Sequence, residues 1–381
     1  MYILYLVLAG VQAWYAHKKG WFATPKGKAH YLILCCAELI LMTAIRGRSV
    51  GSDTGVYLDA LEYYSSLPTG EMLFSDLVKP FNFEFAYFGL VKLCALIDLP
   101  APLFLALIAS IIYIPVFMCI YRYSKLPYIS ILAYFAIGLF AYSLGWFRQM
   151  MALSIVLCGV EYIEKKQWIK YILTLLVAAT FHTSALFAIV LYIAYYFPIK
   201  KFIKWILPAE LLLLVLGRPI SLLMVVVFPK YAGYIGGQYD QQGGTYLMLI
   251  LLNVLLFVLM YLNYKGFMES RLIIAALTVA VFVQAVGYSM AVLGRGVTYF
   301  SFFAIFAFSD IAFAMLNKPE IYTAARDDAL AVGERCVKFA VKHRITWQKV
   351  LWVVFVVGLL GLFLMSLLGN KYIFPFRFFF L

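Results

Sequence analysis

Residues 170–201 read KYILTLLVAATFHTSALFAIVLYIAYYFPIKK, two apolar runs separated by the sequence FHTS at 181–184. Lysines flank the segment at both ends, at Lys170 and Lys200. One continuous helix would place these lysines on opposite sides of a membrane. Two short helices of about 18–21 Å, at 1.5 Å per residue, would form a hairpin and return the chain to the same side. We predict this broken helix hairpin, with His182 at its tip.

The predicted tip lies at an unusual depth. Each arm of the hairpin is shorter than the hydrocarbon core of a bilayer, which is about 30 Å thick. The backbone around His182 would therefore turn below the outer surface of the membrane. Non-helical backbone at that depth is tolerated only inside protein or beside a water-filled cavity. We therefore expect His182 to line a cavity that opens to the outside.

The whole chain has the composition of a membrane protein. Of its 381 residues, 65% are hydrophobic and 13% are charged, whereas a soluble domain has about 45–50% and 25%. The apolar runs approach the length of a membrane span and lack the alternation of barrel strands. We predict an all-α polytopic integral membrane protein, a single membrane domain over 1–381. Its membrane helices should number about 12, at 1–16, 30–45, 101–121, 128–145, 149–163, 170–181, 184–197, 203–216, 246–263, 272–290, 297–316 and 350–368.

The net charge of +13 arises mainly from short loops between the apolar runs. Loops assigned to the cytoplasm hold 21 of the 31 Lys and Arg residues, which is the distribution that sets topology in membrane proteins. This pattern predicts that both termini lie outside and gives no support for a nucleic-acid partner. Segment 317–349 is charged and is expected to form a cytoplasmic loop with a surface helix.

Segment 46–100 is the first large outside loop of the predicted topology. Within it, 54–65 has an apolar helical face, and 83–96 is apolar but interrupted by Glu84 and Lys92. We expect interfacial or re-entrant helices here, because an additional span would invert every later loop and violate the charge rule. The alternative, that 83–96 is a true span, stays open.

Arginine is concentrated on the predicted outer side. The cytoplasmic set contains 16 Lys and 5 Arg, whereas the outer set contains 4 Lys and 6 Arg. A guanidinium group binds phosphate oxygens in a bidentate manner. Arg148, Arg295 and the pair Arg46 and Arg48 lie at helix ends bordered by apolar sequence, which makes them candidates for binding an anionic ligand. The alternative for each is an arginine that reaches the lipid phosphates.

Two further residues are candidates for catalysis. His182 is the only one of the four histidines on the predicted outer side, and a neutral imidazole can accept a proton from a hydroxyl group. A hydrogen-bonded structural histidine is the alternative. Asp53 is a candidate helix N-cap, a candidate base or a carboxylate that positions an arginine. The outer acids include no DxD or ExD pair, so we predict no metal site and no cofactor, and arginine would neutralise a leaving group.

Four pieces of the sequence carry a family resemblance: RGRSVGSDTGVY at 46–57, FRQ at 147–149, FHTSA at 181–185 and RGVTYF at 295–300. In order and spacing, over residues 1 to about 310, they resemble the EpsG family of Wzy-like bacterial polysaccharide polymerases. The resemblance implies a glycosyltransferase on the outer face of the bacterial cytoplasmic (inner) membrane. It would join oligosaccharide repeat units carried on undecaprenyl diphosphate into exopolysaccharide, capsule or O-antigen-type polymer.

The resemblance also implies roles for individual residues. The lipid-linked donor and acceptor would be bound by Arg46, Arg48, Arg148, Arg295, Gln149, Tyr57 and Tyr299, with His182 or Asp53 as the base, in a metal-independent reaction. Membrane lipids are expected partners, and a chain-length regulator is a further candidate. Two alternatives use the same residues: a transporter or flippase of lipid-linked glycan, and a ligase that moves a finished glycan to another acceptor. The sugars, the linkage and the oligomeric state stay open.

Overall fold

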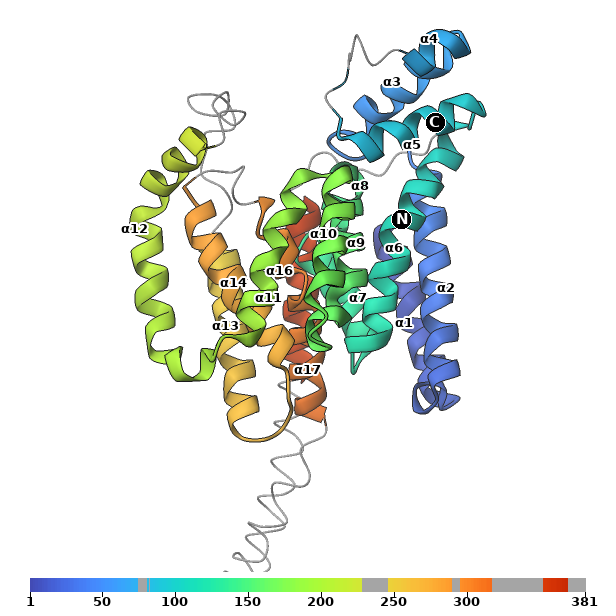
Figure 1. The fold of residues 1–381 in the computed structure, drawn as a ribbon. Coiled ribbons are helices and arrows are strands. Elements are labelled where there is room, and N and C mark those ends of the chain that lie inside the picture. Colours follow the sequence, from blue (N-terminus) through green and yellow to red (C-terminus); the bar gives the residue numbers. More distant parts are fainter. Residues whose placement is uncertain (75–80, 82, 228–245, 290–294, 317–351, 369–381) are drawn as a thin grey trace, which may run out of the picture.

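The computed structural model describes residues 1–74, 81, 83–227, 246–289, 295–316 and 352–368, and every regular element in these ranges is a helix (Figure 1). The elements are α1 (Tyr2–Lys18), η1 (Trp21–Ala23), α2 (Pro25–Ala44), α3 (Thr54–Ser65), α4 (Thr69–Phe74), α5 (Phe85–Leu96), α6 (Ala101–Tyr123), α7 (Pro127–Ala136), α8 (Leu139–Gly145), α9 (Phe147–Glu164), α10 (Trp168–Phe181), η3 (Thr183–Ala188), α11 (Ile189–Tyr196), η4 (Ile199–Phe202), α12 (Ile203–Val227), α13 (Tyr246–Tyr264), α14 (Arg271–Gly287), α16 (Thr298–Ser301), α17 (Ala304–Leu316) and a last helix, Trp352–Leu368.

The all-helical membrane fold is confirmed, but the count of about 12 spans is not. Within the described ranges, 4 helices are long and apolar enough to cross a bilayer, or up to 6 if each of two bent pairs forms one span. The pair α7 and α8 bends by 63°, and the pair Thr183–Tyr196 and Ile199–Ile220 bends by 84°. Other apolar runs form helices of 10–17 residues, α10 and α14 among them. The count of about 12 stays a prediction, because several of the apolar runs form helices that are short or bent within the described ranges.

The predicted hairpin is present. Helix α10 ends at Phe181, and His182 adopts an extended conformation, with φ −159° and ψ 116°, before η3 begins. Near the other end of α10, the Tyr171 hydroxyl donates a 2.8 Å hydrogen bond to the Ala188 carbonyl, so the chain after the turn runs back along α10. His182 therefore occupies the predicted tip.

The described residues of 46–100 form the helices α3, α4 and α5, which lie together at one end of the molecule (Figure 1). Helix α5 packs against α3 and α10. Its 12 residues extend about 18 Å, less than the thickness of a bilayer core. The helices expected at 54–65 and 83–96 therefore exist, and their place at the membrane interface stays a prediction.

The loop before α3 packs directly on the junction between α8 and α9. The Thr54 hydroxyl, which is fully buried, lies within hydrogen-bond distance of the carbonyls of Val50 (2.8 Å) and Leu144 (2.9 Å). Gly51 has φ +102°, and a Cβ atom there would collide with the Leu144 carbonyl. A Cβ atom at Gly145 would lie 2.5 Å from the Ser52 hydroxyl. Two sequence pieces that lie about 90 residues apart are thus in close contact.

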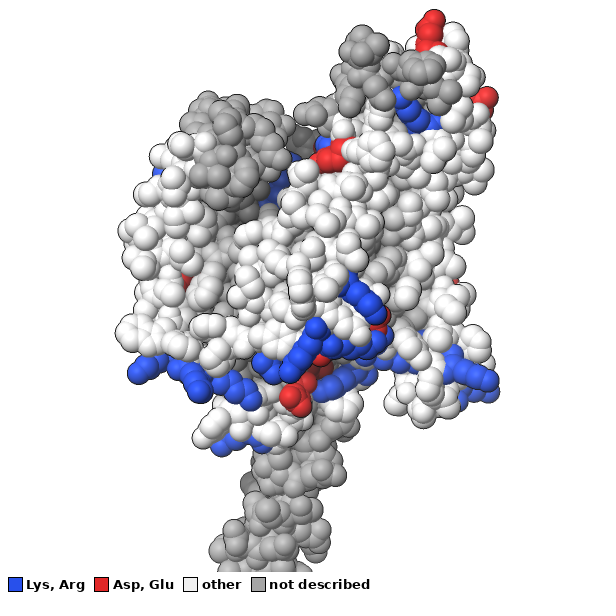
Figure 2. Space-filling model, in the orientation of Figure 1, with Lys and Arg blue, Asp and Glu red and all other residues white. Residues whose placement is uncertain are grey.

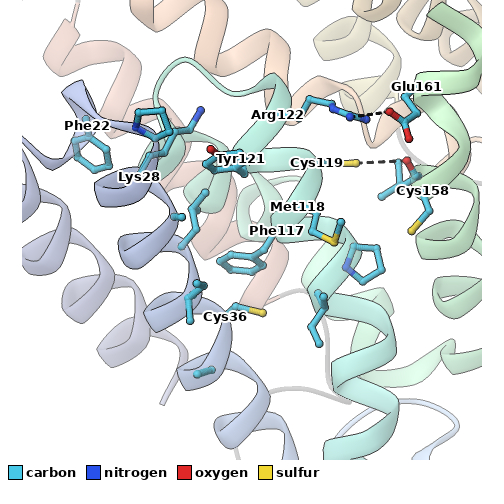
Figure 3. Close-up of a pocket in the computed structure, with 18 of the residues that line it drawn as sticks. Phe22, Lys28, Cys36, Phe117, Met118, Cys119, Tyr121, Arg122, Cys158 and Glu161 are labelled. Carbon is cyan, nitrogen blue, oxygen red and sulfur yellow. Dashed lines mark hydrogen bonds and ion pairs between the residues drawn. The ribbon is translucent and has the colours of Figure 1, made fainter. Parts of the chain in front are cut away.

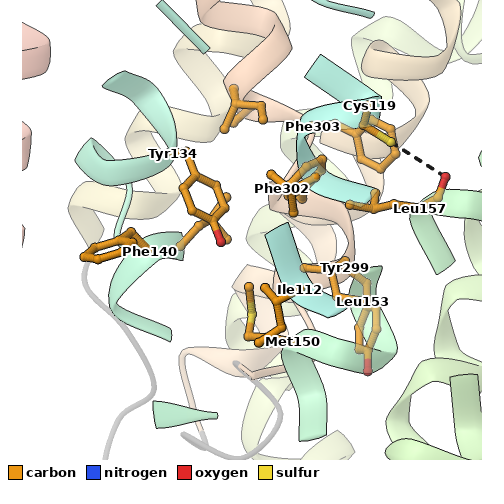
Figure 4. Close-up of a cluster of buried hydrophobic side chains, with 14 of the residues drawn as sticks. Ile112, Cys119, Tyr134, Phe140, Met150, Leu153, Leu157, Tyr299, Phe302 and Phe303 are labelled. Carbon is orange, nitrogen blue, oxygen red and sulfur yellow. Dashed lines mark hydrogen bonds between the residues drawn. The ribbon is translucent and has the colours of Figure 1, made fainter. Parts of the chain in front are cut away.

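Aromatic and aliphatic side chains fill the space between α6, α7, α9 and the chain from α16 to α17. Tyr134 from α7, Met150 from α9 and Phe302 lie in this cluster of buried side chains (Figure 4). The Phe302 and Phe303 rings pack edge to face with centroids 5.9 Å apart. Because this core holds α9 against the chain at 298–316, it determines where the N-terminus of α9 lies.

Basic side chains gather at the end of the molecule opposite α3, α4 and α5 (Figure 2). We call this region the basic belt; it follows the C-terminal end of α1, the turn from α9 to α10, and η4. Its lysines include Lys18, Lys19, Lys165, Lys166, Lys200 and Lys201. The surface helix predicted in 317–349 falls outside the described residues. The single membrane domain over 1–381 stays a prediction.

Candidate functional site

A glutamate connects two of the predicted site residues. Glu84 occupies the N-cap position of α5, and its Oε1 atom lies 2.8 Å from Nδ1 of His182. Its Oε2 atom accepts a 2.5 Å hydrogen bond from Nη1 of Arg148. The three side chains are 17–27% exposed. Arg148, Glu84 and His182 therefore form a continuous chain of polar contacts that is accessible from the surface.

The Glu84 carboxyl is ionised in this setting. Burial alone would raise its pKa, but the hydrogen bond with His182 and the positive charge of Arg148 outweigh burial and lower the pKa to about 2. The backbone N–H of Thr183 also donates to Oε1, at 3.4 Å. Glu84 thus accepts hydrogen bonds from the hairpin tip and from Arg148 at neutral pH.

The contact with Glu84 orients the imidazole ring of His182. A neutral histidine whose Nδ1 donates to a carboxylate has its lone pair on Nε2. Among the described residues, no hydrogen bond involves Nε2 of His182. The ring is therefore oriented with Nε2 away from Glu84, an arrangement in which the carboxylate would stabilise an imidazolium.

Arg148 lies in the first turn of α9, whose N-terminal end faces the site. Its guanidinium group lies 5.1 Å from the Phe83 ring, and the adjacent Phe147 ring stacks on Tyr57 with centroids 4.5 Å apart. Trp146 at the N-cap makes no capping hydrogen bond through its side chain. The first N–H groups and the dipole of an 18-residue helix favour an anion at this end.

Arg295 lies beside the same helix end. Its guanidinium group is 4.9 Å from the Trp146 ring, which stacks on Tyr142 at 4.0 Å. The Gln149 amide donates a 2.8 Å hydrogen bond to the Arg295 carbonyl. Across the part of the chain that the structure describes, Arg295 forms no salt bridge. Its positive charge is therefore available to an anionic ligand.

Tyr299 contacts the hairpin next to its tip, at Ser184. Its hydroxyl lies 3.0 Å from the Ser184 hydroxyl, and the neighbouring rings of Phe187 and Phe300 meet edge to face at 5.5 Å. Tyr299 is only 1% exposed. The pieces FHTSA and RGVTYF are thus in direct contact, and the predicted sugar contact of Tyr299 stays a prediction.

The structure does not bring Arg46 and Arg48 into this chain of contacts. Arg46 is 1% exposed and lies 5.0 Å from the Phe147 ring; its Nε and Nη1 atoms have no hydrogen-bond partner among the described residues. Arg48 forms salt bridges on α3, with Glu62 at 2.8 Å and with Asp59. Their predicted contact with a diphosphate stays a prediction.

Asp53 lies at the predicted N-cap position of α3, but its side chain makes no capping hydrogen bond. Tyr57 is one turn further along α3 and close to both Arg148 and Asp53, whose charges act on its hydroxyl. Within the described ranges, no hydrogen bond or salt bridge joins Asp53 to His182. Glu84, and not Asp53, is the carboxylate that contacts the histidine.

Glu84 is a site residue that the sequence pattern did not predict, because in the sequence it only interrupts an apolar stretch. A single carboxylate among the aromatic residues at 81–88 was the available signal, because an ionisable group in such surroundings needs a charged or polar partner.

The fold and the site together define a multi-pass helical membrane protein with a histidine, a glutamate and arginines at the tip of a broken helix hairpin. The chain matches the family model of the EpsG family over residues 30–322 and belongs to that family. The EpsG family is associated with polysaccharide polymerase or glycosyltransferase activity. The chain matches none of the curated proteins and none of the solved structures. The resemblance expected from the four sequence pieces is thus confirmed.

Proposed function

We propose that the protein is a membrane-embedded glycosyltransferase that polymerises oligosaccharide repeat units carried on undecaprenyl diphosphate. The observation that carries this proposal is the chain from Arg148 through Glu84 to His182, with Arg295 beside it. It places a candidate proton acceptor near cations that suit a diphosphate. The product would be exopolysaccharide, capsule or O-antigen-type polymer.

In the proposed reaction, a hydroxyl oxygen of the acceptor sugar attacks the anomeric carbon of the donor. The bond from this carbon to the diphosphate oxygen breaks, and undecaprenyl diphosphate leaves with the electron pair. The hydroxyl proton moves to Nε2 of His182. Glu84 keeps the ring in place and stabilises the positive charge that develops on it.

The leaving group gains negative charge as the bond breaks. Arg295, Arg148 and the N-terminal end of α9 would stabilise that charge. Arg148 already shares its charge with Glu84, whereas Arg295 has no carboxylate partner among the described residues. Arg295 should therefore make the larger contribution to binding the diphosphate.

The charge distribution supports a site on the outer face of the bacterial cytoplasmic membrane. The basic belt lies at the end opposite α3, α4 and α5 (Figure 2), and basic residues are enriched on the cytoplasmic side of membrane proteins. Helix α5, which begins next to Glu84, packs against α10 at the other end. A transferase on the outer face would take a lipid-linked donor, because nucleotide sugars are not supplied outside the cell.

The test is a gel of glycan products from the purified protein in liposomes supplied with the lipid-linked repeat unit of its host. We expect a ladder from the wild type and from His30→Ala, a histidine at the belt end, and no ladder from His182→Ala. A ladder from folded His182→Ala would reject histidine as the base. Movement of the substrate across the bilayer without a ladder would indicate a flippase, and a single transfer to a different acceptor would indicate a ligase.

A further inference from the structure

A cavity of about 1300 Å³ lies between α2, α6 and α9, at the end of the molecule that carries the basic belt (Figure 3). Apolar side chains form most of its wall, among them Ile33 of α2, Phe117 and Met118 of α6, and Leu157 of α9. We call this cavity the α2–α6–α9 groove. Ile33 and Met118 are 65% and 61% exposed, so the wall presents open apolar surface.

The groove has the length of one membrane leaflet. Along α2 its lining runs from Pro25 to Ile40, which corresponds to about 22 Å at 1.5 Å per residue. A bilayer is about 40–45 Å thick with its head groups, so each leaflet contributes about half of that. The groove therefore fits an extended acyl chain of the leaflet on the side of the basic belt.

One end of the groove is polar and positively charged. Lys28 and Arg122 lie at this end together with Tyr121 and Glu161 (Figure 3). The Lys28 ammonium group donates a 2.7 Å hydrogen bond to the Ser124 carbonyl and lies 5.5 Å from the Tyr121 ring. Arg122 forms a 2.7 Å salt bridge with Glu161. Two cations thus face one carboxylate in the lining, which favours an anionic ligand.

We propose that the α2–α6–α9 groove binds one anionic phospholipid, with an acyl chain along α6 and the head-group phosphate at Lys28 and Arg122. The open apolar wall, the length of one leaflet and the cationic end each match a part of that lipid. The groove is separate from the site at His182. Along α9, Glu161 lies about 20 Å from Arg148 at 1.5 Å per residue. The proposal therefore does not depend on the proposed glycosyltransferase activity.

The test is native mass spectrometry of the full chain in detergent, after equilibration with dioleoyl phosphatidylglycerol or with dioleoyl phosphatidylcholine. The wild type should retain one phosphatidylglycerol molecule at least tenfold more tightly than phosphatidylcholine. Met118 is exposed in the groove wall, so the larger side chain of Met118→Trp should fill the groove. This variant should abolish the retention of phosphatidylglycerol. Leu173 is 55% exposed on α10 and lies outside the groove lining. Leu173→Trp should therefore leave the retention of phosphatidylglycerol unchanged.

The head-group contact has its own pair of variants. Arg122→Gln should reduce the preference for phosphatidylglycerol severalfold, and Lys265→Gln, a lysine outside the groove lining, should not. Equal retention of the two lipids by the wild type, or equal effects of Met118→Trp and Leu173→Trp, would overturn the proposal. A dimer that Met118→Trp dissociates would make a second copy of the chain the occupant. Displacement of phosphatidylglycerol by equimolar undecaprenyl phosphate would assign the groove to the polyprenyl carrier.

Discussion

Oε1 of Glu84 lies 2.8 Å from Nδ1 of His182, although 98 residues separate them in the sequence. The contact joins the start of α5 to the tip of the hairpin formed by α10, η3 and α11. The other carboxylate oxygen of Glu84 accepts a hydrogen bond from Arg148. One side chain thereby positions both a candidate base and a candidate diphosphate ligand.

Replacing Glu84 by glutamine keeps its size and removes its charge. Hydrogen bonds to charged groups contribute about 1.5–3 kcal/mol, so we expect Glu84→Gln to lower kcat by about tenfold or more. KM should change less than kcat, because Arg295, which has no carboxylate partner among the described residues, would still bind the diphosphate. The measurement is the initial polymerisation rate against donor concentration. Glu62→Gln, a carboxylate on α3 that pairs with Arg48, is the control; similar losses in both variants would contradict the positioning role.

Arg295 should contribute to binding the lipid-linked donor, whereas Arg271 should not. We expect Arg295→Gln to raise KM for the lipid-linked donor and to lower kcat, because its charge meets the diphosphate in both the ground state and the transition state. Arg295→Lys should recover only part of the activity, because an ammonium group cannot form the bidentate contact. Arg271→Gln, which removes an arginine bound to the Tyr195 carbonyl, is the control. An unchanged donor KM in Arg295→Gln would exclude this role.

The lowered pKa of Glu84 predicts how its contribution to stability depends on pH. The pKa of the Glu84 carboxyl is about 2 in the folded protein, whereas the ordinary value for glutamate is 4.5. The unfolded chain therefore binds the proton more readily. The contribution of Glu84 is therefore complete above pH 4.5 and is lost as the pH falls through about 2. Thermal unfolding of the wild type and of Glu84→Gln in detergent, at several pH values, measures this effect. The difference in Tm should be largest above pH 4.5 and shrink below it; a constant difference would refute the linkage.

Gly51 is required where the loop before α3 meets the α8–α9 junction. Gly51→Ala should destabilise the protein by about 1–3 kcal/mol or more, because φ +102° is unfavourable for alanine and its Cβ atom would collide with the Leu144 carbonyl. Gly55→Ala is the matched control. No atom lies within 4 Å of a Cβ atom there, and alanine favours the helix of α3. Thermal unfolding compares the two, and equal Tm values would contradict the close approach.

The contact between the Ser184 and Tyr299 hydroxyls should couple the hairpin to the segment at 295–300. We expect Ser184→Ala and Tyr299→Phe each to lower the free energy of unfolding by about 1 kcal/mol. The double variant should lose less than the sum of the two, because each substitution removes the same hydrogen bond. Reversible unfolding of all four proteins measures the coupling energy, and strictly additive losses would show that the two hydroxyls act independently.

The sequence by itself determined the class of fold and much of the residue chemistry. The apolar runs predict helices in a membrane. The lysines at both ends of 170–200 predict the hairpin at 181–184, because lysine is enriched on one side of a membrane. These are local properties of short segments. Residue chemistry also selected His182, Arg148 and Arg295, and the family resemblance added Gln149. The structure gathers these four residues around the tip of the hairpin and the N-terminus of α9.

Only the tertiary structure decided which charged groups pair. It joins Glu84 to His182 and Arg148, buries Arg46 under Phe147 and pairs Arg48 with Glu62. It also shows which apolar runs are short or bent. These outcomes depend on how α5 packs on α10 and how the loop before α3 packs on α8. The sequence pattern reports the preferences of neighbouring residues, whereas such pairs are formed by helix packing between segments that lie far apart in the chain.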